Sequence, residues 1–149
     1  MNNSLILFAS DHRGYELKSK LIVWAAEQGY AAKDLGPDSV ERCDAGDFAT
    51  RLVTELKSKP SQCGVLICGT GQAMAMTANR YRGIRAALCC NVTVARLSRQ
   101  HNDANVLVLG ADITGEGVAV DCLETFLTTE ILGGRYAERR DKLEALGGI

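Results

Sequence analysis

The chain of 149 residues has no long hydrophobic run and almost no net charge. None of its apolar stretches approaches the roughly 20 residues that a membrane-spanning helix needs. The first residues, MNNSLILFASDH, lack the basic region of a secretory signal and turn polar early. A formal charge of −1 provides no general positive field that would attract nucleic acid or an anionic membrane. We therefore expect a cytoplasmic protein with neither nucleic acid nor a membrane as a partner.

The six cysteines form no CxxC pair and are too sparse for a secreted disulfide scaffold. They are Cys43, Cys63, Cys68, Cys89, Cys90 and Cys122. This pattern argues against both a disulfide framework and a zinc site, so we expect reduced thiols that are mostly buried. The chain also lacks internal repeats, low-complexity tracts and linkers, and has only two prolines. Its length suits one domain that spans residues 1–149.

Short apolar stretches alternate with segments of helical periodicity along the chain. The predicted strands are 5–9, 30–35, 64–68, 84–89 and 106–109, and the predicted helices are 15–27, 47–58, 72–81, 92–100, 117–129 and 136–145. Strands rich in Ile, Leu and Val between such helices predict an α/β fold with a buried parallel sheet of five strands. Ligands of open parallel sheets bind beyond the carboxyl ends of the strands, so the turns there are the places to search.

The stretch LICGTGQAM places Cys68 between a predicted strand and a predicted helix. A thiol at a helix N-terminus is stabilised as a thiolate, which can act as a base or a nucleophile. The turn through Gly69, Thr70 and Gly71 would let the backbone N–H groups up to Ala73 converge on a carboxylate, phosphate or enediolate. A plain tight turn with a buried cysteine explains this motif equally well when it is taken alone.

Polar side chains also follow other predicted elements. Asp11 and His12 come after the first strand, where they either bind a ligand or are an N-cap aspartate and a solvated histidine. His101 and Asn102 lie where a helix is predicted to end. A helix C-cap at Asn102 and the helix dipole at His101 would account for both without a function.

Arg135 and Arg139 are four residues apart in GGRYAERR, so they share one face of the last predicted helix, with Arg140 beside them. Two guanidinium groups on one face fit a phosphate dianion. The alternative is a solvated helix whose charge is neutralised by Glu138 and Asp141. A thiol, two histidines, an anion-binding turn and an arginine pair together predict a sugar-phosphate site.

These motifs resemble the ribose-5-phosphate isomerase B family, which is related to the allose- and galactose-6-phosphate isomerases. The resemblance covers almost the whole chain and rests on ASDHRGYELK, LICGTGQAMAMTANR, GIRAALC, SRQHNDANVLVLG and ILGGRYAERR in family order and spacing. It implies a doubly wound, Rossmann-like α/β sheet with a C-terminal helix, and neither metal nor cofactor. It also implies homodimers or dimers of dimers whose active sites are shared between subunits.

The activity that the resemblance implies is aldose–ketose isomerisation of D-ribose 5-phosphate and D-ribulose 5-phosphate. One alternative is the same chemistry on another phosphorylated sugar, such as allose 6-phosphate, galactose 6-phosphate or a tetrose or pentose phosphate. Another is a sugar-phosphate-binding protein without turnover. A dinucleotide-binding domain is disfavoured because the first turn reads SDHRG rather than GxGxxG.

Four residues match catalytic positions of the family: Cys68, Thr70, His101 and Asp11. Cys68 matches the base that moves a proton between C1 and C2, and Thr70 matches the hydroxyl that helps a proton move between the oxygens. His101 matches the residue that opens the furanose ring, with Asp11 as a polar partner of the ring oxygen or hydroxyls. Eight residues match substrate-binding positions: Gly69, Gly71, Gln72 and Ala73 at the enediolate, Asn102 at a hydroxyl, and His12, Arg135 and Arg139 at the phosphate.

Some positions depart from the pattern of the family. One branch has Ser at position 68 and Glu at position 72, but Gln72 cannot accept a proton, which leaves the thiolate as the expected base. Ala45 replaces an aromatic residue that lines the sugar pocket, and Ala73 replaces a glycine of the turn. Asp112 stands where many members have a phosphate-binding arginine, and a carboxylate there would repel a dianion. Arg13 is the candidate to restore the positive charge and bind substrate, unless the sugar differs in length or stereochemistry.

Overall fold

The computed structural model describes residues 5–59 and 62–149, so the predictions for residues 1–4, 60 and 61 lie outside it. The strands are β1 (Ile6–Ser10), β2 (Ala32–Asp34), β3 (Cys63–Cys68), β4 (Ala86–Leu88) and β5 (Val106–Gly110). The helices are α1 (Tyr15–Glu27), α2 (Ala45–Lys57), α3 (Gln72–Ala78), α4 (Val92–Asn102), α5 (Glu116–Thr128) and α6 (Arg135–Ala145). Every predicted strand and helix is present, with ends that differ by at most three residues.

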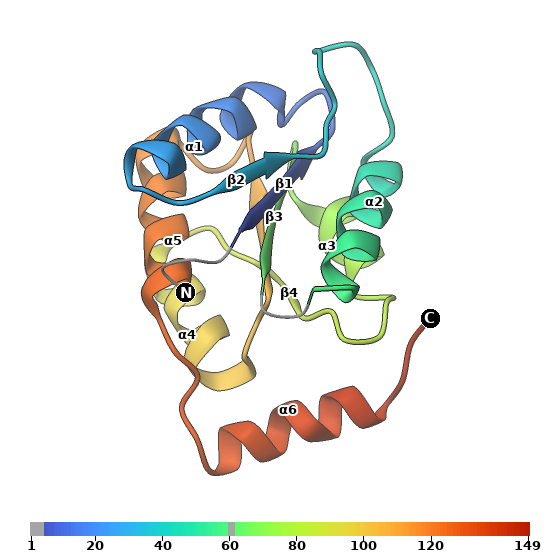
Figure 1. Cartoon of the computed structure of the whole chain (residues 1–149), viewed down its shortest axis with the longest axis vertical. Coiled ribbons are helices and arrows are strands. Elements are labelled where there is room, and N and C mark those ends of the chain that lie inside the picture. The colour runs from blue at the N-terminus through green and yellow to red at the C-terminus, as the bar shows by residue number, and fades with distance from the viewer. Residues whose placement is uncertain (1–4, 60–61) are drawn as a thin grey trace.

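The five strands form one parallel sheet in the order β2-β1-β3-β5-β4. Helices α1, α4 and α5 cover one face of the sheet, and α2 and α3 cover the other (Figure 1). The chain first runs from β1 outward to β2 and then returns to β3 on the other side of β1, which reverses the direction of winding. The predicted doubly wound α/β fold is confirmed.

The central strands have apolar side chains on both faces, and these form two separate cores. Ile6 and Phe8 of β1 point into the core under α1 and α5, whereas Leu7 and Ala9 point into the core under α2 and α3. The edge strands β2 and β4 have only three residues each, none of them buried. The predicted burial is therefore wrong for these two strands, because each has a neighbouring strand on one side only.

Helix α1 is held close to the sheet by one glycine and one buried lysine. A Cβ atom on Gly14 would lie only 2.5 Å from the carbonyl oxygen of Ile67 in β3, so no larger residue fits there. The Lys18 side chain is fully buried, and its Nζ donates to Asp34 Oδ1 and to the Pro37 carbonyl, both at 2.7 Å. These bonds tie α1 to the last residue of β2 and to the loop that leads from β2 to α2.

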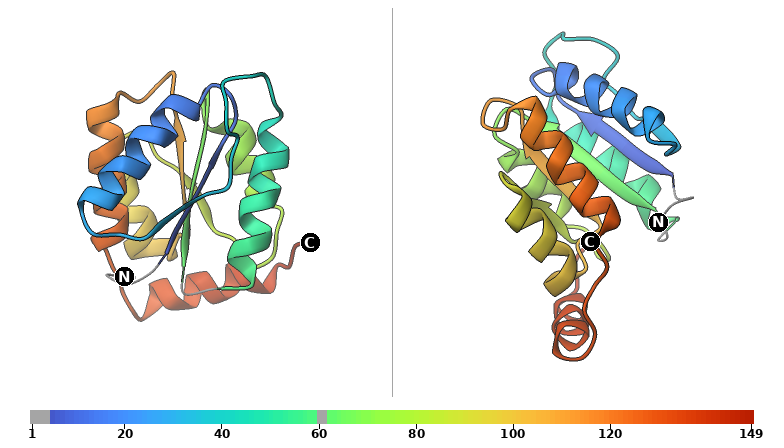
Figure 2. Two further views of the ribbon diagram at one scale, coloured as in Figure 1. Left: turned by 45° about the horizontal axis from the view of Figure 1, so that its top comes forward. Right: turned by 90° about the vertical axis from the view of Figure 1, so that its left-hand side faces the viewer.

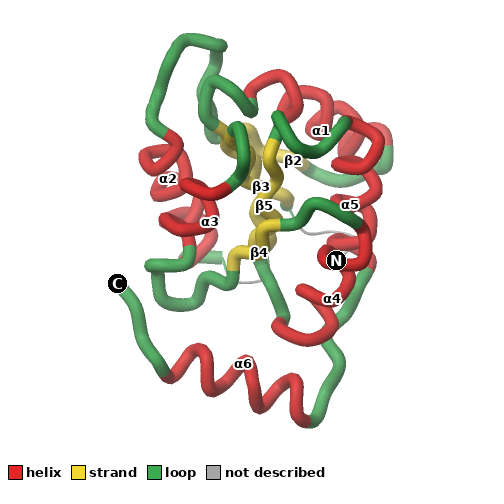
Figure 3. Tube along the Cα trace, turned by 180° about the vertical axis from the view of Figure 1, so that it is seen from behind, coloured by secondary structure: helices red, strands yellow, loops and turns green. Residues whose placement is uncertain are grey.

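Helix α6 covers neither face of the sheet but crosses the end at which the strands begin (Figure 2). It packs against α4, and Asp103 joins the two helices through ion pairs with Arg99 at 3.0 Å and Arg140 at 3.1 Å. Figure 3 shows from behind that α6 and the loops following β1, β3 and β5 lie at opposite ends of the molecule. In the part of the chain that the structure describes, no helix is long and apolar enough to cross a membrane.

All six cysteines are free thiols, as expected. Cys63, Cys68, Cys89 and Cys122 are buried, which confirms the expectation that most of the cysteines pack in the interior. Cys90 is exposed, unlike the mostly buried thiols that we expected, because it follows the edge strand β4 in the turn before α4.

Candidate active site

The turns after β1, β3 and β5 meet at the carboxyl edge of the sheet. Ser10 pairs with Ile67, and Cys68 pairs with Gly110, so the three strands end at nearly the same level. The winding reverses between β1 and β3, which is where ligands of open α/β sheets bind. Asp11 and Cys68 flank this point.

Cys68 is the last residue of β3, and it is only 5% exposed. The Gly71 N–H donates to its Sγ, with an N···S distance of 3.2 Å. Gly71 has a φ of 81°, a left-handed conformation that glycine adopts readily and that turns its N–H back toward the sulfur. The local sequence CGTG thus directs a backbone N–H donor at the Cys68 sulfur.

The residues that follow Cys68 are presented to solvent. Thr70, Gln72 and Ala73 are exposed, and α3 begins at Gln72 with Gly71 as its N-cap. The first N–H groups of a helix have no acceptor within the helix. Here the Gly71 N–H turns inward to Cys68 Sγ, and the Gln72 N–H donates to Thr70 Oγ1 at 3.4 Å. Gly110 allows β5 to approach the turn, because a Cβ there would lie 2.7 Å from the Thr70 carbonyl oxygen.

Asp11 is buried and organises the turn between β1 and α1. Its Oδ1 accepts the N–H groups of Arg13 at 2.9 Å and Gly14 at 3.1 Å. The alternative of an N-cap aspartate is wrong, because α1 has Gly14 as its N-cap and no side-chain cap. These bonds occupy Oδ1 only, so they leave Oδ2 as an acceptor for a ligand.

His12 is half-buried, and its Nδ1 accepts the Cys43 N–H at 3.3 Å. This contact directs the proton of a neutral imidazole to Nε2, which can then donate to a ligand. The adjoining cavity has a volume of about 480 Å³ and is lined by His12, Arg42, Cys43, Asp44 and Ala45. The small side chain of Ala45 contributes to the space beside His12.

Arg13 and Asp112 form an ion pair between the loops that follow β1 and β5. Because β3 lies between these two strands, the pair crosses over the end of β3. A Cβ on Gly69 would lie 2.9 Å from Asp112 Oδ2 and 3.0 Å from Arg13 Nε. Both side chains therefore lie directly against the turn that follows Cys68.

Three of the predicted site residues form a second cluster around Tyr136, and a fourth, Asn102, is next to one of them in the chain. The His101 ring stacks on the Tyr136 ring, with centroids 4.3 Å apart and an interplanar angle of 3°. The guanidinium groups of Arg135 and Arg139 lie over the same ring, at 4.8 and 5.5 Å from its centroid. Asn102, next to His101, is exposed at the end of α4.

The structure separates this second cluster from Cys68 within one chain. Helix α4 ends just before β5 starts at Val106, whereas Cys68 pairs with Gly110 at the other end of that strand. Val106 and Gly110 are four residues apart at about 3.3 Å per residue, so the end of α4 and Cys68 are separated by roughly 13 Å along β5 alone. Figure 1 likewise shows α6 at the end of the sheet opposite the loop between β2 and α2.

Sequence reasoning missed the two residues that organise the second cluster, Tyr136 and Asp103. Tyr136 directly follows Arg135, and an aromatic ring between two arginines was the available signal. The C-cap of α4 is Asp103, with a φ of 49°, and it lies one residue after Asn102, where the cap was expected. Its hydrogen bond raises the pKa of Arg140, and the ion pair between the two side chains joins α6 to the end of α4.

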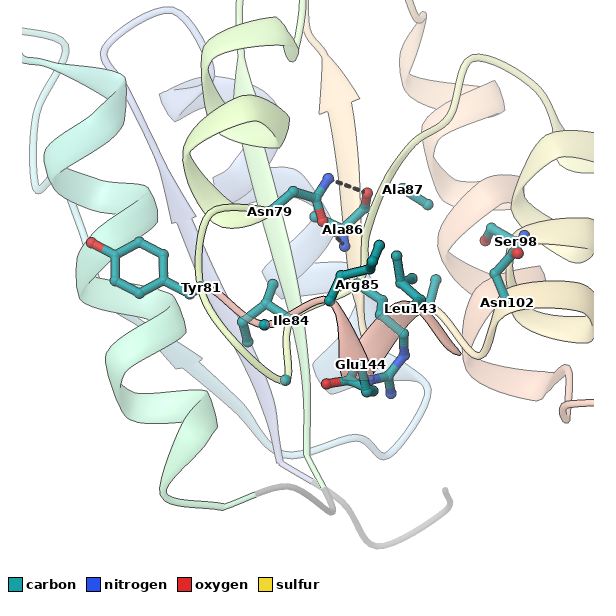
Figure 4. A pocket seen from close by; sticks show the side chains of 14 residues that line it. Asn79, Tyr81, Ile84, Arg85, Ala86, Ala87, Ser98, Asn102, Leu143 and Glu144 are labelled. Carbon is teal, nitrogen blue, oxygen red and sulfur yellow. Dashed lines mark hydrogen bonds and ion pairs between the residues drawn. The ribbon is translucent and has the colours of Figure 1, made fainter. Parts of the chain in front are cut away.

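A cavity of about 440 Å³ lies beside the second cluster, between β4, α4 and α6 (Figure 4). Of the predicted site residues it includes only Asn102. Figure 4 shows the Asn79 side chain paired with the backbone of Ala86, at 2.9 and 2.8 Å, and Arg85 beside Glu144 of α6. This cavity is at the amino edge of the sheet and is separate from the turn of Cys68. Among residues 5–59 and 62–149, no group of three or more His, Cys, Asp or Glu side chains is placed to hold a metal ion.

This doubly wound sheet has a thiol and a glycine turn at the point where its winding reverses, here called the switch point. Such an arrangement is typical of α/β proteins that bind a small ligand there. The profile of the Ribose/Galactose Isomerase family matches residues 6–143, and the chain belongs to this family. It is 36% identical to ribose-5-phosphate isomerase B of Escherichia coli over 141 residues, which are 95% of each protein.

Solved structures agree with this assignment. Ribose-5-phosphate isomerase B of Clostridium thermocellum has a TM-score of 0.93 and 40% identity, covering 95% of this chain and 96% of that one. The Mycoplasma genitalium enzyme with bound ribulose 5-phosphate has a TM-score of 0.94 and 33% identity, covering 98% of this chain and 97% of that one. The predicted resemblance and the predicted class, an isomerase of the ribose-5-phosphate isomerase type, are confirmed.

Proposed function

We propose that this chain interconverts D-ribose 5-phosphate and D-ribulose 5-phosphate through a cis-enediolate, with Cys68 as the base. The observation that carries the proposal is the Gly71 N–H donated to Cys68 Sγ at the switch point of the sheet. Membership of the family and the Mycoplasma genitalium complex with ribulose 5-phosphate support the choice of substrate.

The proposed reaction needs a base and a stabilised oxyanion within a few ångströms, because the α-proton of an aldose is weakly acidic. The Cys68 thiolate removes the proton from C2 of the open-chain sugar, and the electron pair forms the C1–C2 double bond. Negative charge then develops on O1, where the N–H groups from Gly69 to Ala73 stabilise it. The thiol returns the proton to C1, and Thr70 helps a proton move from O2 to O1.

The active site is proposed to be completed by a second copy of the chain. Cys68 and the second cluster lie at opposite ends of one chain, so His101 would act on a sugar held by the partner's turn. In this arrangement His101 opens the furanose ring with Asp11 as the polar partner, and Asn102 binds a hydroxyl. His12 and the guanidinium groups of Arg135 and Arg139 hold the phosphate. A closed two-fold dimer would form two such sites.

A second candidate is the same reaction on a larger sugar phosphate, such as allose or galactose 6-phosphate. The cavity beside His12, to which Ala45 contributes, favours this reading. The absence of a cofactor, of nucleic-acid partners and of membrane binding, and a cytoplasmic location, stay predictions.

Ketose formation from a panel of aldose phosphates tests the substrate, and the Cys68→Ala variant tests the base. We expect Cys68→Ala to abolish exchange of the C2 proton with solvent, measured by NMR in deuterated water, while binding of the sugar phosphate persists. Cys63→Ala, at the other end of β3, is the matched control and should retain exchange. Undiminished exchange in Cys68→Ala would rule out Cys68 as the base. If the wild-type protein forms no ketose from any sugar in the panel, the protein binds sugar phosphates without turnover.

A further inference from the structure

The Arg13–Asp112 ion pair occupies a position that folding stability does not explain. The two side chains are 60% and 44% exposed, and ion pairs with that exposure contribute little to stability because solvent screens them. The pair nevertheless bridges two strands that are not neighbours and covers the backbone of Gly69.

The backbone of each partner is fixed to the same edge of the sheet. The Arg13 N–H donates to Asp11 Oδ1 at 2.9 Å, and the Asp112 N–H donates to the Gly69 carbonyl at 2.9 Å. The long Arg13 side chain would still be free to rotate, and Asp112 fixes its guanidinium over Gly69. Fixing a side chain before a ligand arrives removes part of the entropy that binding would otherwise lose.

The guanidinium keeps donors for a ligand while it is paired. It has five N–H donors in a planar fork, and one carboxylate occupies at most two of them in a bidentate contact. Arg13 also directly follows His12, whose Nδ1 is already bonded to the Cys43 N–H. The same turn thus carries a cation over Gly69 and, one residue earlier, an imidazole, and a cation suits an anion with several acceptor oxygens.

We propose that Arg13 binds the phosphate of the substrate and that Asp112 is a positioning residue, which holds the Arg13 guanidinium over Gly69. The phosphorylated sugar itself rests on the proposed function, but the binding of a phosphate group does not. The proposal has a distinctive consequence, since removal of a negative charge at Asp112 weakens the binding of a dianion.

The kinetic test compares Arg13→Ala, Asp112→Ala and the double variant on the sugar phosphate that the wild-type enzyme turns over best. We expect Arg13→Ala to raise KM about tenfold or more with kcat nearly unchanged. This result indicates the loss of a contact that the bound substrate and the transition state make equally. Asp112→Ala should raise KM by a smaller factor, and the double variant should be no worse than Arg13→Ala, because both changes remove one contact. Asp112→Glu, which keeps the carboxylate, should recover most of the affinity.

The matched control is the Lys20–Glu116 ion pair between α1 and α5, at 3.1 Å and with both side chains 56% exposed. Lys20→Ala and Glu116→Ala should leave KM and kcat unchanged. If Asp112→Ala instead lowers KM, the carboxylate only repels the substrate, and its positioning role is wrong. If Arg13→Ala has the same KM as the wild-type enzyme, Arg13 does not bind the phosphate.

A titration with inorganic phosphate separates this proposal from the proposed function. Backbone amide shifts in NMR report phosphate binding without turnover, and thermal unfolding confirms that each variant is folded. If the wild-type protein turns over no sugar but binds phosphate in an Arg13- and Asp112-dependent way, only the proposed function fails. Equal phosphate affinity in the wild-type protein, Arg13→Ala and Asp112→Ala would refute the pair's role.

Discussion

Single residues of the same type behave differently in this protein because their surroundings differ. Burial raises the pKa of the Cys63 and Cys122 thiols to about 11 and that of Cys89 to about 12. These thiols stay protonated near neutral pH and pack as small apolar groups. Cys68 is also buried, but it receives the Gly71 N–H at its sulfur. Among the buried thiols of the described residues, only that of Cys68 accepts a backbone N–H.

The raised thiol pKa values predict a loss of stability at alkaline pH. The ordinary thiol pKa is 9.0, so the unfolded chain releases these protons before the native state does. The contribution of Cys63 to the free energy of unfolding is then constant below pH 9 and falls as the pH rises from about 9 to about 11. Urea unfolding near pH 8 and near pH 10.5 measures this loss, which should be smaller in Cys63→Ala by about 1–2 kcal/mol. An equal loss in both proteins would contradict the assignment.

Secondary-structure elements set the shape of the turn after Cys68 through close backbone contact. Gly110 at the end of β5 lies against the Thr70 backbone, and a Cβ there would be 2.7 Å from both the carbonyl carbon and oxygen of Thr70. Backbone atoms cannot move aside as the end of a flexible side chain can. The end of β5 thus determines where the turn that follows β3 lies.

Gly110→Ala is therefore expected to lower kcat at least tenfold by displacing the Thr70 turn, with a loss of stability of about 1–3 kcal/mol. Gly117→Ala in α5 is the matched control, because its added Cβ would meet no atom within 4 Å. That variant should keep wild-type kcat and stability. Steady-state kinetics and thermal unfolding test both variants, and an unchanged kcat in folded Gly110→Ala would show that the turn tolerates the added methyl group.

At the scale of the whole molecule, the predicted site residues lie at two ends of one chain. The turn of Cys68 is at the carboxyl edge of the sheet, and the stack of His101 on Tyr136 is at the amino edge, next to α6. Asp103 stabilises that second end by pairing with Arg85, Arg99 and Arg140. A complete site then requires a second chain, as we propose.

Mixing two inactive variants tests this arrangement. Random exchange between Cys68→Ala and Arg135→Ala subunits makes half of the dimers mixed, and a site shared between chains is intact once in each of these. About a quarter of wild-type activity should therefore return, as the two-fold symmetry requires. Native mass spectrometry verifies the exchange. Verified mixed dimers without activity would place Cys68 and Arg135 in the same chain's site.

The sequence by itself determined the strands, the helices and the glycine turn after Cys68, because these depend on neighbouring residues. Apolar periodicity predicted all the elements, and CGTG predicted a glycine turn beside a thiol. Family motifs identified the isomerase class, while the roles of the individual site residues stay predictions. The local pattern failed where burial depends on neighbours in space, as in the half-exposed edge strands β2 and β4.

Only the tertiary structure decided which distant residues meet. It paired Arg13 with Asp112 over Gly69, and it buried Lys18 against the loop between β2 and α2. In the folded chain, His101, Arg135 and Arg139 lie at the end of the sheet away from Cys68. These contacts join residues far apart in the chain, and they arise because parallel strands bring their ends together while the crossover helices fix the order. No periodicity or spacing in the sequence encodes that order, so it emerges only when both faces of the sheet are packed.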